Sequence, residues 1–469
     1  MRKLSSRNAP LNAQRAFVLA LASLAACSSG GSGGSPVPPP IHGTPGPPPQ
    51  STPPPREVRA HIKHVVIVVQ ENRSFENFFH GFPGARTAKY GYLHDGTRVR
   101  IHPVTLVGKD IAHAWSDGIS DWDNGRMDRF DLNRLSDGQQ AGAYAYGYVP
   151  HRYIEPYWSM ARQYVLADAM FPTMFGGSFT AHLDLIATTT NLHSGEAEVD
   201  NPLAMPWGCD APSGTRTSIL NASRSEGAGD GPFPCFKQFA TMADLMDAAH
   251  VSWAYYAPAV KGGNTGGRVW SEFDSIESVR YGSDWRADVI SPPSAILDDV
   301  AKKRLRSVSW VIPDWQDSDH PGVPDHGPSW VSSVVNAIGE SPYWNSTAIV
   351  VLWDDWGGWY DSMPPPQLDF RGLGIRVPCI VVSAYARKGY VSHTEYEFGS
   401  LMALIEESFG LPALSSLGFG SGYTDQRAYS ITDVFDFKQP ARTFTPIAAR
   451  YPAGFFRAEK ASARPPDDE

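Results

Sequence analysis

Two apolar runs of strand length stand out in the hydropathy pattern of the chain. Residues 64–70 and 347–353 consist largely of apolar and β-branched side chains, without the polar alternation of a half-buried strand. Such continuous runs are typical of strands that are buried on both faces. Each run ends directly before polar groups, Glu71-Asn72 in the first case and Asp354-Asp355 in the second.

The rest of the pattern alternates between strand-like and helix-like segments. Further strands are expected at 251–256, 308–312 and 376–382, and helices at 157–169, 176–186, 241–249, 330–338 and 397–409. Residues 84–150 predict long loops, and the polar residues 191–235 predict a surface insertion. The alternation predicts an α/β fold, with a mainly parallel central sheet and helices on both faces.

The polar groups after the two apolar runs are well placed for chemistry, because ligands of open α/β sheets bind beyond the carboxyl ends of the strands. Adjacent carboxylates such as Asp354 and Asp355 repel each other unless a cation lies between them or one keeps its proton. With Glu71 and Asn72 they form a set that suits Ca²⁺, Mg²⁺ or Mn²⁺, or Zn²⁺ or Fe if a histidine joins. The alternative is that the aspartates begin a turn and Asn72 caps a helix.

Ser178 follows two glycines at the start of an expected helix. Backbone N–H groups at a helix start favour an anion, and glycines let a substrate approach closely. His182 lies four residues further on and therefore on the same helical face. The alternatives are an ordinary helix cap for Ser178 and a structural role for His182.

Other histidines are candidates for phosphate binding or proton transfer. His320 and His326 lie in a loop with three acidic residues, 317–326, directly after an expected strand. Histidine titrates near neutral pH and can protonate a leaving group or bind phosphate oxygens. His113 and His393 are similar candidates, and a polar surface loop is the alternative for the 317–326 segment.

The first residues predict export. Positively charged residues precede a short apolar segment, 16–26, which is followed by Cys27. This is the pattern of a secretory signal, and the segment is shorter than the roughly 20 residues that span a bilayer. The sequence Leu24-Ala25-Ala26-Cys27 resembles a bacterial lipobox, so we expect a signal peptide at 1–26, a lipidated Cys27 and a membrane-anchored lipoprotein; ordinary secretion is the alternative. The Ser/Gly/Pro-rich residues 27–58 then form a disordered tether.

Net charge and cysteines add two limits. The formal net charge of -9 provides no global basic field, so we expect no nucleic-acid partner. Cys209 and Cys235 flank a Gly/Ser-rich segment of an exported chain and are expected to form a disulfide. Cys379 lies within an apolar run and is expected to be a buried free thiol.

Four segments together resemble a known family. They are residues 61–75, 318–321, 353–361 and 374–378, and they include Glu71-Asn-Arg-Ser-Phe75 and Trp353-Asp-Asp-Trp-Gly-Gly358. The chain resembles the bacterial phosphoesterase family that includes non-haemolytic phospholipases C and metal-dependent acid phosphatases, within the alkaline-phosphatase-like superfamily. The resemblance extends from about residue 60 to 415 and implies an alkaline-phosphatase-like fold.

The resemblance implies roles for several residues. Glu71, Asn72, Asp354 and Asp355 correspond to metal ligands. Ser178 falls where the family has its Ser or Thr nucleophile, although the family often continues with Pro-Asn-Arg, where this chain has the string that ends in His182.

The histidines complete the expected site. His320 matches a phosphate-binding or acid histidine, and His113 corresponds to another. Ser362 stands where many members have a histidine after the aspartate, here Asp361, and the expected substrate-binding or phosphate-binding histidines are His182, His326 and His393.

The expected function is metal-dependent hydrolysis of phosphate esters through a serine nucleophile, by an acid phosphatase or phospholipase C-like enzyme. Its substrate would be a phosphate-ester small molecule or a phospholipid head group. Residues 59–440 would form a single domain with insertions, and 441–469 a C-terminal extension. Trp356, Trp359 and Tyr360 could line a choline or lipid site through cation–π contacts, or belong to the core. The alternative function is a non-catalytic cell-envelope lipoprotein that uses the same fold as a binding module.

Overall fold

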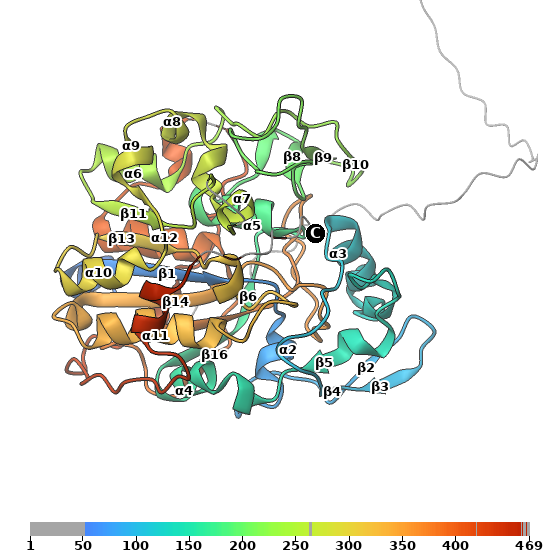
Figure 1. Cartoon of the computed structure of the whole chain (residues 1–469), viewed down its shortest axis with the longest axis horizontal. Coiled ribbons are helices and arrows are strands. Elements are labelled where there is room, and N and C mark those ends of the chain that lie inside the picture. Colours follow the sequence, from blue (N-terminus) through green and yellow to red (C-terminus); the bar gives the residue numbers. More distant parts are fainter. Residues whose placement is uncertain (1–51, 262–264, 419, 461, 463–465, 467–469) are drawn as a thin grey trace, which may run out of the picture. The chain divides into compact units, whose positions relative to one another are not determined.

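A nine-stranded sheet forms the centre of the molecule (Figure 1). Its strand order is β12 (Val289–Ile290), β11 (Trp253–Tyr256), β13 (Val308–Val311), β1 (His64–Gln70), β14 (Thr347–Trp353), β15 (Val377–Ser383), β6 (Val165–Phe171) and β16 (Tyr390–Ser392), with β17 (Tyr396–Glu397) also paired to β6. β15 runs antiparallel to both of its neighbours, and every other pair is parallel. The α/β fold with a mainly parallel sheet is confirmed.

The computed structural model describes residues 52–469, apart from 262–264, 419, 461, 463–465 and 467–469. These residues belong to one compact unit. The expected signal peptide, Cys27 and residues 27–51 of the expected tether lie outside the described residues, as does most of the chain end that follows residue 464. The tether prediction is wrong at its end, because Pro55–His61 form a helix and Val58 is buried in the core. Among the described residues, no helix is both long and apolar enough to cross a membrane.

Helices cover both faces of the sheet. One group packs around α5 and the other around α11, and Figure 1 shows them on opposite sides of the strands. The first group contains α1 (Pro55–His61), α5 (Ser178–Ala187), α6 (Met242–Ala248), α7 (Gly267–Trp270) and α12 (Gly399–Phe409). The second group contains α4 (Glu155–Gln163), α10 (Ala295–Ala301), α11 (Gly327–Gly339) and α13 (Ala453–Ala458).

Shorter elements lie outside the central sheet. They are α2 (Phe75–Phe79), α3 (Trp115–Trp122), α8 (Glu277–Arg280), α9 (Asp284–Ala287), the hairpin of β2 (Tyr90–Tyr92) and β3 (Arg98–Arg100), and the pair β4 (His102–Pro103) and β5 (Gly147–Tyr148). Part of the expected insertion at 191–235 is an antiparallel sheet of β7 (Asn191–His193), β8 (Glu196–Val199), β9 (Ser218–Asn221) and β10 (Glu226–Gly227).

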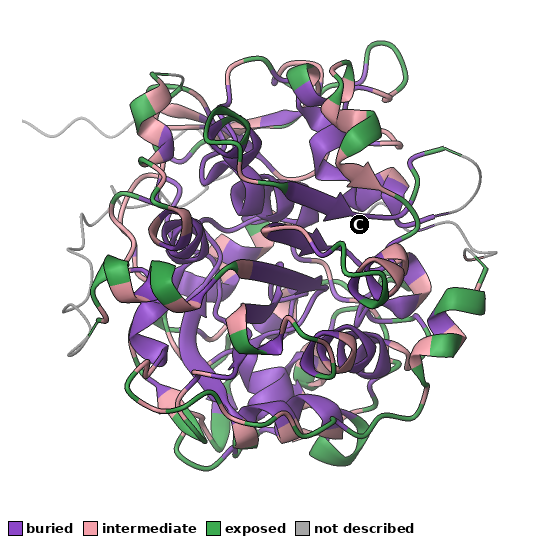
Figure 2. Ribbon diagram, turned by 90° about the vertical axis from the view of Figure 1, so that its left-hand side faces the viewer, coloured by how far each residue is buried: buried purple, intermediate pink, exposed green. Residues whose placement is uncertain are grey.

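The register of the central strands brings their carboxyl ends together. β1 and β14 pair along their whole length, and the last partners are Gln70 and Trp353. Both strands are almost completely buried between the helix layers, as the purple strands in Figure 2 show. Because both strands end at the same level, the residues that follow them emerge side by side.

One sequence prediction of secondary structure is wrong, and one predicted strand is present in a direction that the sequence does not indicate. Residues 157–169 were expected to form one helix, but α4 ends at Gln163 and β6 begins at Val165. The Ala, Leu and Met residues of β6 tolerate a helix, and pairing with β15, β16 and β17 holds them extended instead. The strand expected at 376–382 exists as β15, but its direction is opposite to that of the other strands.

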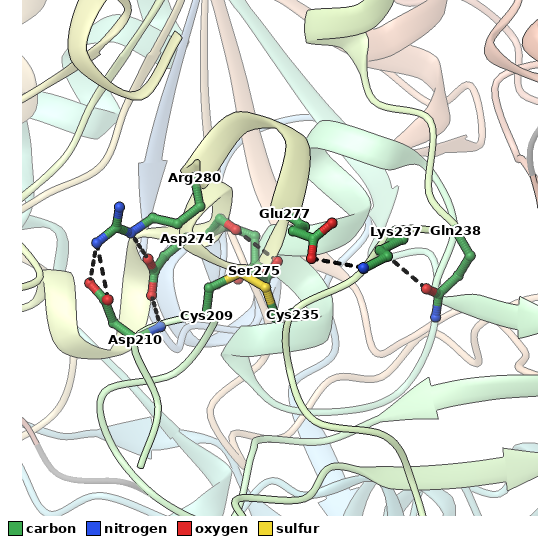
Figure 3. The surroundings of a disulfide bond; sticks show 10 residues. Cys209, Asp210, Cys235, Lys237, Gln238, Asp274, Ser275, Glu277 and Arg280 are labelled. Carbon is green, nitrogen blue, oxygen red and sulfur yellow. Dashed lines mark hydrogen bonds and ion pairs between the residues drawn. A yellow bond between two sulfur atoms is a disulfide. The ribbon is translucent and has the colours of Figure 1, made fainter. Parts of the chain in front are cut away.

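The predicted disulfide between Cys209 and Cys235 is present (Figure 3). It closes a loop of 26 residues in the insertion. Beside it, Arg280 of the α8 region forms ion pairs with Asp210 and Asp274, so the disulfide links two parts of the insertion and an ion pair holds the insertion to the α8 region. Cys379 is a buried free thiol, as expected.

The C-terminal residues 447–460 pack against the loop that follows β13. The Gln316 side-chain amide donates a hydrogen bond to the Lys460 carbonyl, and the His326 ring contacts Tyr451 and Phe455 edge-on. His326 Nδ1 lies 3.2 Å from Asp317 Oδ1 and 3.4 Å from Glu459 Oε1. Burial alone would lower the pKa of His326, but its bonds to these two carboxylates outweigh burial and raise the pKa to about 9.

We therefore expect Glu459→Gln to reduce the free energy of unfolding by about 1 kcal/mol near neutral pH. Because the folded-state pKa of His326 is raised, its contribution is complete below its unfolded-state pKa and disappears as pH rises through about 9. Urea unfolding of both proteins over a pH series measures the difference. Glu340→Gln, at an exposed acid outside any ion pair among the described residues, is the control. A difference that persists well above the His326 pKa would contradict this explanation.

Candidate active site

The loops after β1 and β14 are joined by backbone hydrogen bonds. The Asp354 N–H donates to the Gln70 carbonyl (2.9 Å), and the Arg73 N–H donates to the Asp355 carbonyl (3.0 Å). The Asn72 N–H donates to Asp354 Oδ1 at 3.0 Å. The two motifs that lie far apart in the sequence therefore form one rigid unit at the edge of the sheet.

Glycines allow these two loops to approach closely. Asn72 has a left-handed backbone with φ of 60°, a conformation that is uncommon outside glycine and recurs at functional sites. Gly357 has φ of 58°, and a Cβ at this position would lie 2.3 Å from the Asn72 carbonyl oxygen. The Gly357 N–H also donates to Asp355 Oδ1 at 2.7 Å. Gly357, the first glycine after the Asp-Asp motif, is thus required for two reasons: its backbone is left-handed, and there is no room for a Cβ.

Glu71, Asp354 and His182 form a group with the geometry of a cation site. One ligand atom from each lies within 4.8 Å of the others, and all three residues are buried. His182 Nε2 is 3.3 Å from Glu71 Oε1 and 3.7 Å from Asp354 Oδ2. Among the described residues, Asp354 Oδ2 has no hydrogen-bond partner. A buried carboxylate oxygen in this situation fits a metal ion, because burial of an uncompensated charge is costly.

Asn72, Asp355 and His113 extend this group. The Asn72 side-chain amide donates to His113 Nε2 at 3.0 Å, and His113 Nε2 lies 3.8 Å from Asp355 Oδ2. The predicted ligands Glu71, Asn72, Asp354 and Asp355 thus lie at one edge of the sheet, and His182 lies beside them. The sequence predicts substrate binding for His182, because its position on the helix gives no indication of which group the helix faces.

Ser178 is the first residue of α5, one turn before His182. It is fully buried, and its Oγ has no hydrogen-bond partner among the described residues. The preceding Gly177 has Asn201 side-chain atoms within about 3.0 Å of the position where a Cβ would stand. Because His182 contacts Glu71 and Asp354, α5 presents this end of its buried face to the carboxylate group.

The tautomers of His113 and His320 are fixed by backbone carbonyls. His113 Nδ1 donates to the Ile111 carbonyl at 2.6 Å, and His320 Nδ1 donates to the Pro321 carbonyl at 2.8 Å. In the neutral imidazole, the lone pair is then on Nε2, where a proton can be accepted or a ligand bound. The ring of Trp270 lies near both His182 and His320, with centroid distances of 6.5 and 6.3 Å.

Sequence reasoning missed the role of Arg73. This fully buried guanidinium donates to the carbonyls of Asp319 (2.8 Å) and Leu106 (2.8 Å), and burial lowers its pKa to about 10. The Asp319 carboxylate accepts hydrogen bonds from Tyr157 and Trp353. Arg73 therefore fixes the loop that carries His320 to the end of β1. The sequence contained one signal of this role, namely a charged residue within a segment that is otherwise buried.

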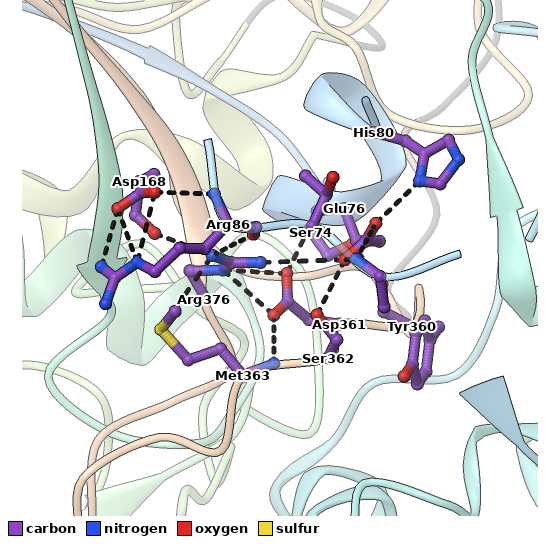
Figure 4. Close-up of polar contacts among 12 residues, drawn as sticks. Ser74, Glu76, His80, Arg86, Asp168, Tyr360, Asp361, Ser362, Met363 and Arg376 are labelled. Carbon is purple, nitrogen blue, oxygen red and sulfur yellow. Dashed lines mark hydrogen bonds and ion pairs between the residues drawn. The ribbon is translucent and has the colours of Figure 1, made fainter. Parts of the chain in front are cut away.

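Asp361 and Ser362 belong to a different network (Figure 4). Arg376 Nε donates to both Asp361 oxygens at 3.0 and 3.1 Å, and burial raises the pKa of Asp361 to about 6. Ser362 Oγ donates to Glu76 Oε2 at 2.9 Å, and Glu76 also contacts His80 and Arg376. The Ser362 hydroxyl, at the position where many family members have a histidine, therefore forms a structural hydrogen bond to Glu76.

Other candidates lie elsewhere or in the core. His326 is bound to Asp317 and Glu459, and the exposed His393 lies 2.9 Å from Asp168 of β6. Neither histidine has a contact with the Glu71 group among the described residues. The aromatic residues suggested for a choline or lipid site are buried members of a core cluster, namely Trp356, Trp359 and Tyr360.

The geometry defines an α/β protein with a buried carboxylate and imidazole group at the carboxyl edge of its sheet. A model of the Phosphoesterase family matches residues 62–412. The chain belongs to the Phosphoesterase family, as its motifs predicted.

Curated relatives include bacterial phospholipases C. The chain is 25% identical over 413 residues to a non-hemolytic phospholipase C of Pseudomonas aeruginosa, and the match covers 75% of this chain and 54% of that protein. It is 24% identical over 447 residues to phospholipase C B of Mycobacterium tuberculosis, with 82% and 80% covered. Among solved structures, the chain is similar to a Vibrio parahaemolyticus protein in the alkaline phosphatase superfamily. The match covers 79% of this chain and 70% of that protein at 10% identity, with a TM-score of 0.35.

Gly357→Ala should damage the site because a Cβ has no space beside the Asn72 backbone. We expect a loss of about 2 kcal/mol or more in the free energy of unfolding and a roughly 10- to 100-fold weaker divalent-metal affinity. Chemical unfolding and calorimetric metal titration measure these effects. Gly96→Ala is the matched control, since Gly96 also has a positive φ but no atom within 4 Å of its Cβ position. Equal losses in both variants would mean that backbone strain, and not the close approach to Asn72, is responsible.

Proposed function

We propose that this protein hydrolyses phosphate esters with a divalent metal ion and with Ser178 as its nucleophile. The observation that carries the proposal is the buried group of Glu71, Asp354 and His182 at the same end of the sheet as Ser178. Carboxylates that are brought this close together favour a cation between them, Asp354 Oδ2 accepts no hydrogen bond from the described residues, and a phosphate ester is a ligand for such a cation.

The proposed reaction has two steps. The Ser178 hydroxyl loses its proton to water as Oγ attacks phosphorus in line with the leaving alcohol. The P–O bond to that alcohol breaks, the departing oxygen takes up a proton, and a phosphoserine remains. Water then attacks the phosphoserine, which releases phosphate and restores the Ser178 hydroxyl. A divalent ion, when bound, would lower the pKa of the Ser178 hydroxyl and neutralise charge on the phosphoryl oxygens.

The histidines are proposed to handle protons and phosphoryl oxygens. In its protonated form, His320 would protonate the departing alcohol or donate to a phosphoryl oxygen through Nε2, because its Nδ1 proton is already bound to a carbonyl. His113 would hold Asn72 and Asp355 in place through its own Nε2. His326 and His393, proposed for substrate binding on sequence grounds, would require a different conformation to reach the site.

The proposed metal is a borderline divalent ion. Four oxygen-bearing residues alone would suit Ca²⁺ or Mg²⁺, whereas an imidazole among them favours Zn²⁺, Mn²⁺ or Fe²⁺. His182 Nε2 lies at 3.3 and 3.7 Å from carboxylate oxygens of Glu71 and Asp354, which is the spacing of neighbouring ligands around one small ion.

The proposed substrate is a phosphate-ester small molecule or a phospholipid head group. The relatives named above are phospholipases C, but this chain spans only 54% of the first one's length. The N-terminal sequence supports export and a lipid anchor at Cys27, so substrates outside the cytoplasm are proposed.

Ser178→Ala should abolish turnover without unfolding the protein. We expect kcat to fall by roughly 10³-fold or more, because no other group can form the covalent intermediate. Hydrolysis of p-nitrophenyl phosphate and of p-nitrophenyl phosphorylcholine should be measured side by side, since a monoester and a diester distinguish the two substrate classes. Ser332→Ala, at a buried serine of α11, is the control. Full activity in Ser178→Ala would exclude this nucleophile.

Removal of the metal provides an independent test. Chelation should abolish both activities, and added Mn²⁺ or Zn²⁺ should restore them better than Ca²⁺. His182→Gln should reverse part of this preference and weaken metal binding by roughly tenfold or more, as measured by elemental analysis and titration calorimetry. If the wild-type protein binds metal and phosphate but hydrolyses neither substrate, the alternative of a non-catalytic binding module is supported.

A further inference from the structure

The hairpin of β2 and β3 has two very different faces. Gly91 and Val99 point inward, and a Cβ at Gly91 would lie 2.6 Å from the Tyr146 ring, so this side packs tightly on the domain. The alternating residues point outward and are exposed: Tyr90, Tyr92, Arg98 and Arg100. The exposed fractions of Tyr90 and Tyr92 are 43% and 52%, which is high for large aromatic side chains.

The outward residues form an ordered tyrosine–arginine surface. Tyr90 pairs across the hairpin with Arg100, and Tyr92 pairs with Arg98. The Arg98 guanidinium also lies over the Tyr90 ring, 4.6 Å from its centroid. No carboxylate among the described residues forms an ion pair with Arg98, Arg100 or Lys89. The cations of this surface therefore remain available to an external anion.

A hollow of about 620 Å³ adjoins this surface. Its charged and aromatic lining consists of Lys89, Arg100, His80, His102, Tyr90 and Tyr148, and no acidic residue among the described residues lines it. The His80 ring packs on the Tyr148 ring at 4.6 Å, and its Nδ1 is bound to the buried Glu76. A phosphate group entering the hollow would meet Lys89 and Arg100 beside aromatic walls.

We propose that the outer face of the β2–β3 hairpin and this hollow dock the protein onto the surface of an anionic phospholipid bilayer. Arginine binds phosphate through a planar set of donors, and tyrosine favours the interface between water and lipid. Each basic residue close to an anionic membrane adds attraction. The chain carries a net charge of -9, so general electrostatics oppose such binding and a local basic face is required.

Charge complementarity selects this partner over another copy of the chain. If two copies met hairpin to hairpin, the cations of one face would repel those of the other, and the net charge of -9 on each chain would add to the repulsion. The exposed Asp95 is the hairpin's own acidic residue, and it is located in the turn, where it accepts a hydrogen bond from the Thr97 N–H. The docking surface does not include any residue of the Glu71 group, so the inference is independent of the catalytic proposal.

Vesicle flotation tests the inference directly. All proteins should carry Cys27→Ser, so that no attached lipid contributes. Vesicles of phosphatidylcholine alone are compared with vesicles that also contain phosphatidylglycerol. We expect binding to the anionic vesicles that weakens as salt is raised, and a roughly tenfold or larger loss of partitioning in Arg98→Gln with Arg100→Gln. Tyr90→Ser with Tyr92→Ser should weaken binding at all salt concentrations.

A matched variant controls for the loss of exposed aromatic and basic side chains. Tyr281→Ser with Arg286→Gln alters the α8–α9 region, which Figure 1 shows far from β2 and β3. It should bind as the parent protein does. Equal binding by the hairpin variants and the parent would overturn the proposal, as would equal binding to neutral and anionic vesicles. Binding of inorganic phosphate at the hairpin without vesicle binding would assign the face to a soluble anion instead. Because flotation requires no turnover, a catalytically inactive protein can still pass this test.

Discussion

The in-register pairing of β1 with β14 is the interaction on which the candidate site depends. The two strands end at the same level, at Gln70 and Trp353, and this brings the following residues Glu71 and Asp354 close together. Backbone bonds then join the following residues, and Gly357 permits their close contact. A shift of one residue between these strands would turn every side chain to the other face and would move Asp354 away from its place beside Glu71. The strand register thus fixes the position of the charges.

Burial also determines how those charges are compensated. In a low-dielectric interior, each carboxylate needs a cation or hydrogen-bond donors. Asp361 has Arg376, and the loop of Asp319 is held by Arg73, so these two acidic residues serve the structure. Around Glu71 and Asp354, the facing group is the imidazole of His182, and Asp354 Oδ2 accepts no hydrogen bond from the described residues. Asp361 is thus compensated by a buried arginine, whereas the group around Asp354 Oδ2 suits an external cation.

The sequence predicted the features that depend on local pattern. These features are the apolar runs of β1 and β14, the acidic residues that follow them, and the disulfide. They could be predicted from the sequence because apolar runs and chain position are visible in it. Three features could not be predicted from the sequence, because each depends on which surfaces meet after folding. They are the direction of β15, the existence of strand β6, and the contact of His182 with Glu71. Ser362 illustrates the same limit: the sequence showed a missing histidine, but only the fold shows that its hydroxyl binds Glu76.

Electrostatics link the cation requirement to the proposed substrate. Without a cation, the carboxylates of Glu71, Asp354 and Asp355 would repel a phosphate ester, and the net charge of the chain would add to that repulsion. A divalent ion, when bound, would offset two of these three negative charges and would offer a positive centre to the phosphoryl oxygens. The same carboxylates would then determine metal binding and admit an anionic substrate only when the metal is present. A basic face such as the β2–β3 hairpin must therefore lie outside this site, where its arginines cannot neutralise the carboxylates that hold the ion.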